Sequence, residues 1–402
     1  MVSLKRVVLV LAYVAWLTAP PSLSHADTEK PTSVFLTWVS VTNWLFEVGD
    51  TRIMTDGYIT RIPEKAFSGL GFATATPARP DVAAIERVIA GLGNSGKIDF
   101  ILTGHSHFDH SFDTATWAKL TGAKIIGSRS TCLQAEAQGI PASQCTAVEG
   151  GETMALGEHV AVRVVRWNHS GDVTTPFGKV LYTPLELAKV PNVASASAGL
   201  RPGTLQDFPN GGGARAYLFT AVTKDGPVSW FYSNTGNADT FVKPAPVDED
   251  FFETQGLSLE NLVAVPHERP PQDNLRAALR AAGIDRVGLW IGYSDRRLAE
   301  AVCSVLRPRT HIPHHWDGLF SPFFDGLPFA YTTVAGTDTV ASFLKSQDVG
   351  LLPPQQYMDK FALTTKGVTL VANDDIKAAL GLTMPSPTAS GTGQQKRVVH
   401  NH

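Results

Sequence analysis

Residues 102–113 read LTGHSHFDHSFD, and the middle of this stretch places three imidazoles and one carboxylate within six positions. The chain holds 12 histidines in 402 residues, so chance clustering is a weak explanation and a metal site is the favoured one. The apolar segment that leads into the motif predicts a buried strand. Because residues i and i+2 of an extended chain point the same way, His105, His107 and Asp109 are expected to face one side. His110 points elsewhere unless the chain turns at once into the helix that is predicted to start at the next residue.

Composition narrows the class of protein. The formal net charge is -3, with 43% hydrophobic and 18% charged residues, which describes a globular chain with a sizeable core. No segment is basic enough to form a nucleic-acid surface, so nucleic acid is excluded as an expected partner. A small-molecule substrate is the expected partner instead.

The N-terminus predicts export. Lys5-Arg6 precede a short apolar run, and Ser24-His25-Ala26 follow it as a small-x-small cleavage pattern. The run is shorter than the ~20 apolar residues that a membrane-spanning helix needs. We therefore expect residues 1–26 to be a cleaved signal peptide, with the mature protein periplasmic or secreted and without a membrane span.

Three cysteines remain in the chain: Cys132, Cys145 and Cys303. In an exported protein the first two are close enough in sequence to form a disulfide, and the alternative is two separate buried thiols. Cys303 lies in an apolar helical pattern and is expected to pack as a small hydrophobic residue.

Strand and helix patterns follow one another from residue 33 to about residue 320, with no internal linker. Short strands are predicted over residues 33–57, and helices over 80–92 and 111–122. The connection 170–213 is rich in Pro, Gly, Ala and Ser and is predicted to be a long functional or disordered loop. We expect one layered α/β domain over residues 27–383 and a disordered tail over 384–402.

The segment HSHFDH matches the HxHxDH signature of the metallo-β-lactamase superfamily. Four other segments resemble that superfamily's elements in the same order: TRIMTDG, RWNHSGD, FYSNTGNAD and PHHW. The last two are similar to the branch that contains ascorbate-phosphate lactonases and N-acyl-phosphatidylethanolamine phospholipase D. The resemblance implies an α/β fold of four layers, an αββα sandwich, and a metal-dependent hydrolase.

The resemblance also implies a ligand set. One metal would be held by His105, His107 and His169, and a second by Asp109, His110 and His315. Asp109 would in addition be the catalytic residue that orients the attacking water and takes its proton. Asp56 and Asp113 would orient ligand imidazoles, as carboxylates behind metal-binding histidines commonly do. His314, the neighbour of His315, is expected to point away.

One position departs from the superfamily pattern. Asn234 stands where relatives place an aspartate that bridges both metals, and a neutral amide is a poorer bridge between two dications. We expect one or two Zn²⁺ ions, with Asn234 a weak ligand and the second ion held less tightly or bridged by water alone. Asp172 and Asp239 are possible substitutes for the missing carboxylate.

The predicted activity is hydrolysis of an ester, lactone or phosphodiester by a zinc-activated hydroxide. Trp316 and Phe320 follow His315 and are either pocket residues, which would favour a substrate with an apolar portion, or core residues. The alternative function is a metal-binding protein of the same fold with little or no hydrolytic activity. The intact HSHFDH argues against it. An iron-dependent oxidative enzyme is a weaker third reading, because those relatives depend on the bridging carboxylate.

Overall fold

The first sheet begins with three antiparallel strands, as predicted for residues 33–57: β1 (Val34–Ser40), β2 (Asn43–Val48) and β3 (Thr51–Thr55). The computed structural model describes residues 29–64, 76–93, 96–170, 173–175, 178–180, 183–193, 198–245 and 261–382. Strands β4 (Phe100–Leu102), β5 (Lys124–Gly127) and β6 (Cys145–Ala147) extend the sheet in parallel on one side. Strands β18 (Asp359–Thr364) and β19 (Gly367–Val371) close the other side, giving the order β19-β18-β1-β2-β3-β4-β5-β6.

The second sheet has the order β17-β16-β15-β13-β12-β8-β7. Its antiparallel part consists of β7 (Thr153–Ala155), β8 (Val160–Trp167), β12 (Ala214–Thr223) and β13 (Gly226–Ser233). Its parallel part consists of β15 (Leu289–Gly292), β16 (Thr310–Pro313) and β17 (Gly350–Leu351). Parallel neighbours end at the same edge of a sheet, so the residues that follow β15 and β16 are brought together.

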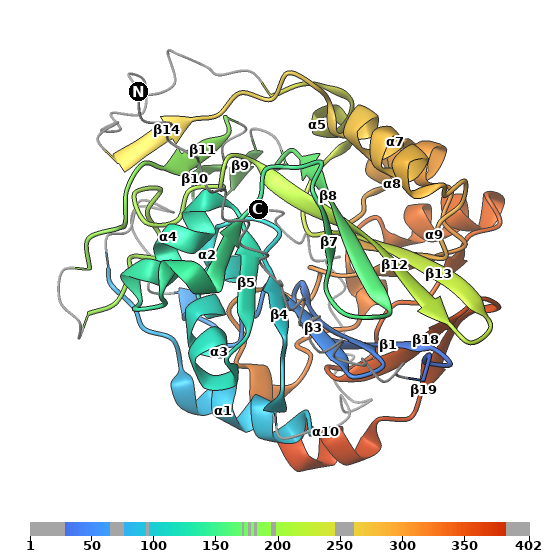
Figure 1. The fold of residues 1–402 in the computed structure, drawn as a ribbon, viewed down its shortest axis with the longest axis horizontal. Helices are drawn as coiled ribbons and strands as arrows, with labels where there is room; N and C mark the ends of the chain where they lie inside the picture. Colours follow the sequence, from blue (N-terminus) through green and yellow to red (C-terminus); the bar gives the residue numbers. More distant parts are fainter. Residues whose placement is uncertain are drawn as a thin grey trace, which may run out of the picture.

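Helices cover the outer faces of the two sheets (Figure 1). On the first sheet they are α1 (Val82–Gly91), α2 (Phe108–Ser111), α3 (Thr114–Thr121), α4 (Arg129–Ala137) and α10 (Asp374–Leu380). On the second they are α5 (Ala238–Val242), α7 (Pro271–Ala282), α8 (Arg296–Leu306) and α9 (Thr337–Ser346). The result is the four-layer αββα sandwich of metallo-β-lactamase type that the sequence predicts.

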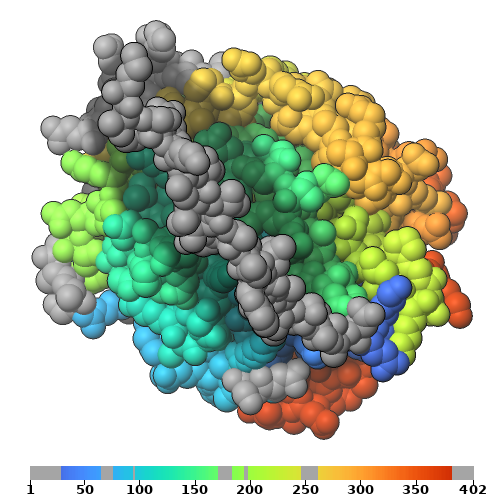
Figure 2. Space-filling model, in the orientation of Figure 1, coloured from blue at the N-terminus to red at the C-terminus, as the bar shows by residue number. Residues whose placement is uncertain are grey.

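The C-terminal segment belongs to the first half of the molecule. Helix α10 packs against α1, and both lie at the bottom of the space-filling view, α10 in red and α1 in light blue (Figure 2). Strand β18 pairs with β1, so residues more than 300 positions apart share one sheet. The C-terminal segment therefore completes the first sheet, and the described residues form a single layered unit.

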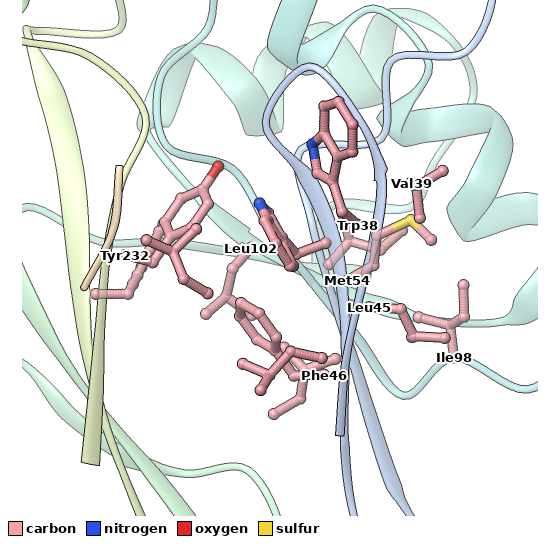
Figure 3. Packing of buried hydrophobic residues seen from close by; sticks show 14 of the residues in the cluster. Trp38, Val39, Leu45, Phe46, Met54, Ile98, Leu102 and Tyr232 are labelled. Atoms are coloured by element: carbon pink, nitrogen blue, oxygen red, sulfur yellow. The ribbon is translucent and has the colours of Figure 1, made fainter. Parts of the chain in front are cut away.

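Aromatic side chains fill the space between the sheets. Phe46 of β2 lies edge-on to Trp230 of β13, with ring centroids 5.6 Å apart, and Trp230 stacks on Phe219 of β12 at 4.7 Å. Figure 3 shows Phe46 and Tyr232 approaching from the two sheets. Burying one such side chain contributes roughly 1.5–3 kcal/mol, so this layer contributes substantially to the stability of the sandwich.

The connection 170–213 differs from the predicted long loop. It contains the hairpin β9 (Val173–Thr175) and β10 (Gly178–Val180), and then β11 (Leu185–Leu187), which pairs with β14 (Leu262–Ala264). These strands are only three residues long, too short for alternation of apolar residues to reveal them. Residues 171–172, 176–177, 181–182 and 194–197 of this connection lie outside the described residues.

Cys132 and Cys145 form a disulfide that ties α4 to β6, and Cys303 is free and buried in α8. Of the two alternatives for the first two cysteines, the structure therefore has the pair. The expected signal peptide and the expected tail fall outside the described residues. Among the residues that are described, no helix is long and apolar enough to cross a membrane.

Candidate metal centre

The histidines of the motif and their partners stand at the ends of strands. His105 and His107 follow β4, His169 follows β8, and His315 follows β16. All of them except His107, which is half-buried, are buried. The segments meet at one edge of the sandwich although they are far apart in sequence, which is what the parallel strand pairs β3–β4 and β15–β16 make possible.

His105, His107 and His169 form a first group. One ring nitrogen from each lies within 4.8 Å of the others. Nε2 of His105 is 3.2 Å from Nδ1 of His107, and the His169 ring lies edge-on to both of the other rings, with centroids 4.7–4.8 Å away. Three imidazoles that aim at one point are a donor set typical of zinc.

Asp109, His110 and His315 form a second group, in which one ligand atom from each residue lies within 4.8 Å of the other two. Oδ2 of Asp109 lies 3.1 Å from Nε2 of His110 and 3.2 Å from Nε2 of His315. The two Nε2 atoms are 3.4 Å apart. The structure thus brings together, in two groups, the six residues that the resemblance implies as ligands.

The division between the groups comes from a helix that starts earlier than predicted. Helix α2 begins at Phe108 with His107 as its N-cap residue, whereas the sequence placed the helix start at Ser111. The expectation that Asp109 faces the same side as His105 and His107 is therefore wrong. Asp109 and His110 lie in the first turn of α2, and this turn carries both of them to His315.

The protein groups of this site shift one another's pKa values. Burial acts to raise the pKa of Asp109, but His110 and His315 outweigh burial and hold that pKa well below its usual range. Burial acts to lower the pKa of His110, but Asp109 and Asp56 raise it to about 10. For His105, burial and the neighbouring imidazoles together hold the pKa well below its usual value. In the metal-free protein the second group therefore pairs a carboxylate with a cationic imidazole, whereas the His105 imidazole of the first group is neutral.

Asp56 supports the second group from behind, as expected. Its Oδ2 is 2.9 Å from Nδ1 of His110, so a proton on Nδ1 leaves Nε2 to face Asp109 and His315. Thr42 and Tyr232 donate their hydroxyls to the same oxygen at 2.6 and 2.7 Å. This is the usual arrangement of a carboxylate behind a metal-binding imidazole.

Asn234 does not lie where a bridging ligand would lie. Its Oδ1 is 3.3 Å from Nδ1 of His105, and its Nδ2 donates to Oδ2 of Asp56 at 3.0 Å. Both contacts are on the Nδ1 side of the imidazoles, opposite to the Nε2 atoms of His105 and His110 that face the other ligands. The prediction of Asn234 as a metal ligand is therefore not met by this geometry. The amide is a hydrogen-bonding partner behind the ligands.

Gly104 makes this close packing possible. A Cβ atom built on Gly104 would lie 2.0 Å from Nδ2 and 2.3 Å from Cγ of Asn234. No side chain fits there, so the residue before His105 has to be glycine for Asn234 to reach the imidazole.

Asp113 acts elsewhere than expected. Its carboxylate accepts hydrogen bonds from the backbone N–H groups of Ile59 and Thr60 at 2.6 and 2.7 Å, and from the Thr60 hydroxyl. Burial raises its pKa to about 6, although these hydrogen bonds oppose the shift. In the described part of the chain its hydrogen-bond partners include no ligand imidazole. Asp113 therefore fixes the loop that follows Asp56 instead of orienting a ligand.

Asp239, one of the two possible substitutes for the missing carboxylate, lies on the surface. Asp239 pairs with Arg297 at 3.2 Å, and the side chains of both residues are more than half exposed. Asp172 lies outside the described residues.

The two residues that flank His315 in sequence both point away from the ligands. His314 points away as expected, because Trp44 donates to its Nδ1 at 3.1 Å and its Nε2 is 3.0 Å from the Ser233 carbonyl oxygen. Trp316 stacks on Trp38 at 5.4 Å in the core. It also lines a cavity of about 370 Å³, whose lining contains none of the six ligand residues. The structure therefore places Trp316 in the core, not in a pocket beside the metal groups.

Phe320 is half-buried and packs against an apolar cluster that includes Phe108, the residue between the ligands His107 and Asp109. It remains a candidate for an apolar wall beside the ligands.

Sequence reasoning did not single out Arg61, Asp317 and Tyr357. The three side chains meet in a buried network next to His315, whose backbone φ of +62° is strained. Strain of this kind costs about 1–3 kcal/mol and persists only where neighbours enforce it. Asp317 directly follows the PHHW motif, which is the one sequence signal that could have drawn attention to it.

No family model matches the chain. It is 30% identical over 147 residues to a UPF0173 metal-dependent hydrolase of Pyrobaculum arsenaticum, which covers 37% of this chain and 56% of that protein. It is 37% identical over 89 residues to a UPF0173 metal-dependent hydrolase of Anaeromyxobacter dehalogenans, covering 21% of this chain and 32% of that protein. The chain thus spans about half or less of the length of these curated relatives.

Among solved structures, the chain is similar to Igni18, a metallo hydrolase from Ignicoccus hospitalis, with a TM-score of 0.41 and 13% identity over 82% of this chain and 98% of that one. It is also similar to CmlA, a diiron β-hydroxylase from Streptomyces venezuelae, with a TM-score of 0.43 and 10% identity over 83% of this chain and 54% of that one. Likenesses of this strength say nothing about the reaction that the chain performs.

Proposed function

We propose that this chain, which has the metallo-β-lactamase fold and the HxHxDH motif of that superfamily, is a metal-dependent hydrolase. The observation that carries the proposal is the convergence of six side chains into two groups, each with its ligand atoms within 4.8 Å. The curated relatives described above are named metal-dependent hydrolases, which supports the same reading.

The donor set fits metal ions better than it fits the protein alone. Five imidazoles and one carboxylate lie together, all of them buried except the half-buried His107, and Nε2 of His110 faces Nε2 of His315 at 3.4 Å. The lone pairs of these two nitrogens repel unless a proton or a metal lies between them, and in the metal-free protein His110, whose pKa is about 10, supplies the proton. Asp109 adds a buried carboxylate whose oxygens accept no hydrogen bond that meets the usual geometric limits. A divalent cation in each group would satisfy these atoms at once.

Zinc is the ion that we propose for both groups. Imidazole nitrogen with carboxylate oxygen is a common zinc donor set, and three protein ligands leave a position open for water or substrate. A divalent metal lowers the pKa of a water that it binds to about 7 and polarises a carbonyl or phosphoryl oxygen.

The protein's own part in the reaction follows from the positions of its side chains. Asp56 and Asn234 fix the His110 and His105 rings from behind, so these rings do not need to reorganise. Asp109, from the first turn of α2, lies beside His110 and His315 and would orient the attacking water. Among the described residues no other carboxylate is grouped with these ligand atoms, so Asp109 is the residue to which we assign the catalytic role.

The proposed substrate is a small molecule with an ester, lactone or phosphodiester bond and an apolar portion. Phe108, which lies between two ligands in sequence, and Phe320, which packs against the same apolar cluster, are the proposed apolar wall. We further propose that the protein is exported, which the disulfide between Cys132 and Cys145 supports, because disulfides persist in oxidising compartments.

The test is turnover by the zinc-loaded protein of nitrophenyl esters, lactones and bis-nitrophenyl phosphate. Activity that is lost with a chelator and with His107→Ala, but kept in His159→Ala, supports the proposal. His159 lies in the turn between β7 and β8, so its substitution controls for the loss of an imidazole outside the site. Tight zinc binding without turnover of any of these substrates would instead favour a metal-binding protein of the same fold.

A further inference from the structure

The loop that follows His315 is anchored by side chains from two distant segments. Asp317 is fully buried, and its Oδ2 accepts hydrogen bonds from Nη2 of Arg61 at 3.0 Å and from the hydroxyl of Tyr357 at 2.8 Å. Arg61 also donates through Nη1 to the Gly318 carbonyl oxygen and through Nη2 to the Tyr357 hydroxyl. The side chains of Arg61 and Asp317 are 2% and 0% exposed, so this is a buried ion pair.

The same network reaches the backbone of His315 itself. The His315 N–H donates to the Val41 carbonyl oxygen at 3.0 Å, and the Val41 N–H donates to Oδ2 of Asp317 at 3.1 Å. Both His315 and Val41 have positive φ angles, +62° and +45°, which side chains with a Cβ rarely adopt. Val41 is β-branched, so its conformation is the more strained of the two. The two residues hold each other in place, and Asp317 closes the ring.

The turn that contains Val41 also contacts the other imidazole of the second group. Thr42 donates to Asp56 at 2.6 Å, and its hydroxyl is 3.0 Å from Nδ1 of His110. The first group is fixed differently. His105 has Asn234 behind it, and His169 is 2.9 Å from the Ser170 carbonyl oxygen through its Nδ1. A change at Asp317 therefore reaches the second group directly, through the His315 backbone, and the first group only through the longer path of Thr42, Asp56 and Asn234.

We propose that Arg61, Asp317 and Tyr357 are positioning residues for the second metal: they hold His315 in its strained backbone conformation so that its Nε2 faces His110 and Asp109. This inference rests on the proposed metal site. A purely structural role would lower the stability of the whole domain, whereas a positioning role changes the affinity of one metal and leaves that of the other.

The experiment is a titration of the metal-free protein with Zn²⁺ in competition with a chromophoric chelator. Wild type is expected to show two binding events. In Asp317→Asn the uncharged amide no longer pairs with Arg61, and the affinity of one event should fall 10–100-fold, the range typical of changes behind a metal ligand. The other event should stay within twofold of wild type. Tyr357→Phe removes one hydrogen bond and leaves the ion pair, so it should show the same pattern with a smaller effect.

Arg52→Met is the matched control. Arg52 is also buried, 3% exposed, and lies 3.4 Å from the carboxylate of Glu47, but it donates to the carbonyl groups of Leu92, Gly93 and Lys97 at the other end of β3. Its loss should lower the unfolding temperature of the metal-free protein and leave both zinc events unchanged.

Three results would overturn the inference. Both zinc events could be unchanged in Asp317→Asn and Tyr357→Phe, both could weaken equally, or the Arg52→Met control could show the same selective loss. Should Asp317→Asn fail to fold, Tyr357→Phe decides in the same way. If the wild-type protein binds no zinc, the proposed metal site is refuted. If wild type binds two ions and the variants bind them equally well, only the positioning role is refuted.

Discussion

Replacing Asn234 by aspartate tests the most unexpected feature of the site. The substitution restores the residue that the resemblance to the metallo-β-lactamase superfamily implies as a metal bridge, so a sequence-based argument predicts tighter metal binding. The structure predicts the reverse. Nδ2 of Asn234 donates to Oδ2 of Asp56 at 3.0 Å, and a carboxylate of the same shape would place two negative oxygens at that distance behind the ligands.

The magnitude follows from two competing costs. Two unit charges 3.0 Å apart repel by about 5.5 kcal/mol at an effective dielectric constant of 20. Protonating the introduced carboxyl instead costs about 1.36 kcal/mol for each pH unit above its ordinary pKa of about 3.9, or about 4 kcal/mol at pH 7. The second cost is smaller, so the introduced group takes up a proton, which it can donate to Asp56 as the amide donates its N–H. His110, whose pKa is about 10 and whose Nδ1 lies 3.1 Å from Nδ2 of Asn234, favours the ionised form, so the values that follow are upper limits. The folded-state pKa of the introduced carboxyl is raised, so the loss of stability grows as the pH rises above about 4: about 1.5 kcal/mol at pH 5 and about 4 kcal/mol at pH 7.

The assay is chemical denaturation of the metal-free wild type and Asn234→Asp at pH 5 and pH 7. Asn234→Ala serves as the control, because it removes the same hydrogen bonds without adding a charge. It should cost about 1–3 kcal/mol at both pH values. The reasoning is refuted if Asn234→Asp is as stable as wild type at pH 7, or if the zinc-loaded variant holds its metals more tightly than wild type does.

Four further predictions follow from particular contacts. Gly104→Ala would place a Cβ 2.0 Å from Asn234, so the zinc affinity of the first group should fall at least tenfold in the chelator titration, and a variant that binds both ions normally would contradict the geometry. Removal of metal should lower the unfolding temperature measured by calorimetry, since a ligand at 100 times its Kd stabilises the folded state by about 2.7 kcal/mol. Burial raises the pKa of Asp113 to about 6, above the value of about 4 in the unfolded state. Between these two pH values the folded state binds the proton more tightly, so the free energy of unfolding falls as the pH rises from about 4 to 6. Asp113→Asn should therefore flatten the pH dependence of the free energy of unfolding in that window, by about 3 kcal/mol in total, and an unchanged profile would argue against the shift. Cys132→Ser opens the bond to Cys145, 13 residues away, and should lower the free energy of unfolding by about 3 kcal/mol in a denaturant titration, with no further change in reducing buffer.

Much of the fold could be predicted from the sequence because strong apolar alternation marks the long strands. The segments around β1–β3, β8, β12 and β13 each carry it over several residues, and the helices α1, α7 and α8 each have an apolar face. The three-residue strands β9, β10 and β11 could not be predicted, because three residues do not establish a period. Their pairing depends on tertiary contacts, such as the one between β11 and β14.

The ligand set could be proposed from a motif, but the grouping of the ligands depends on where a helix begins. A start at Phe108 rather than at Ser111 moves Asp109 from one face to the other. Spacing within six residues cannot decide this, since His107 can cap a helix or continue a strand. The residues that lie behind the ligands were harder to predict from the sequence than the ligands themselves. Arg61 and Tyr357 are buried only because chain segments 296 residues apart meet at Asp317 and at each other, and no local pattern records such a meeting.

Asp56 explains why an amide is suited to position 234. Its carboxylate carries one negative charge and accepts from the Thr42 hydroxyl, the Tyr232 hydroxyl and the Gly104 N–H, while also facing Nδ1 of His110. A fifth neighbour at 3.0 Å has to be a donor, and Nδ2 of Asn234 is one. Its Oδ1 then remains to face Nδ1 of His105, so a single amide joins one imidazole of the first group to the carboxylate behind the second. An aspartate at this position could bridge two metals only by turning away from Asp56, which would give up the contact that Nδ2 of Asn234 makes. Position 234 and Asp56 therefore have to be compatible with each other, and a substitution at one of them should be tolerated better when the other changes with it.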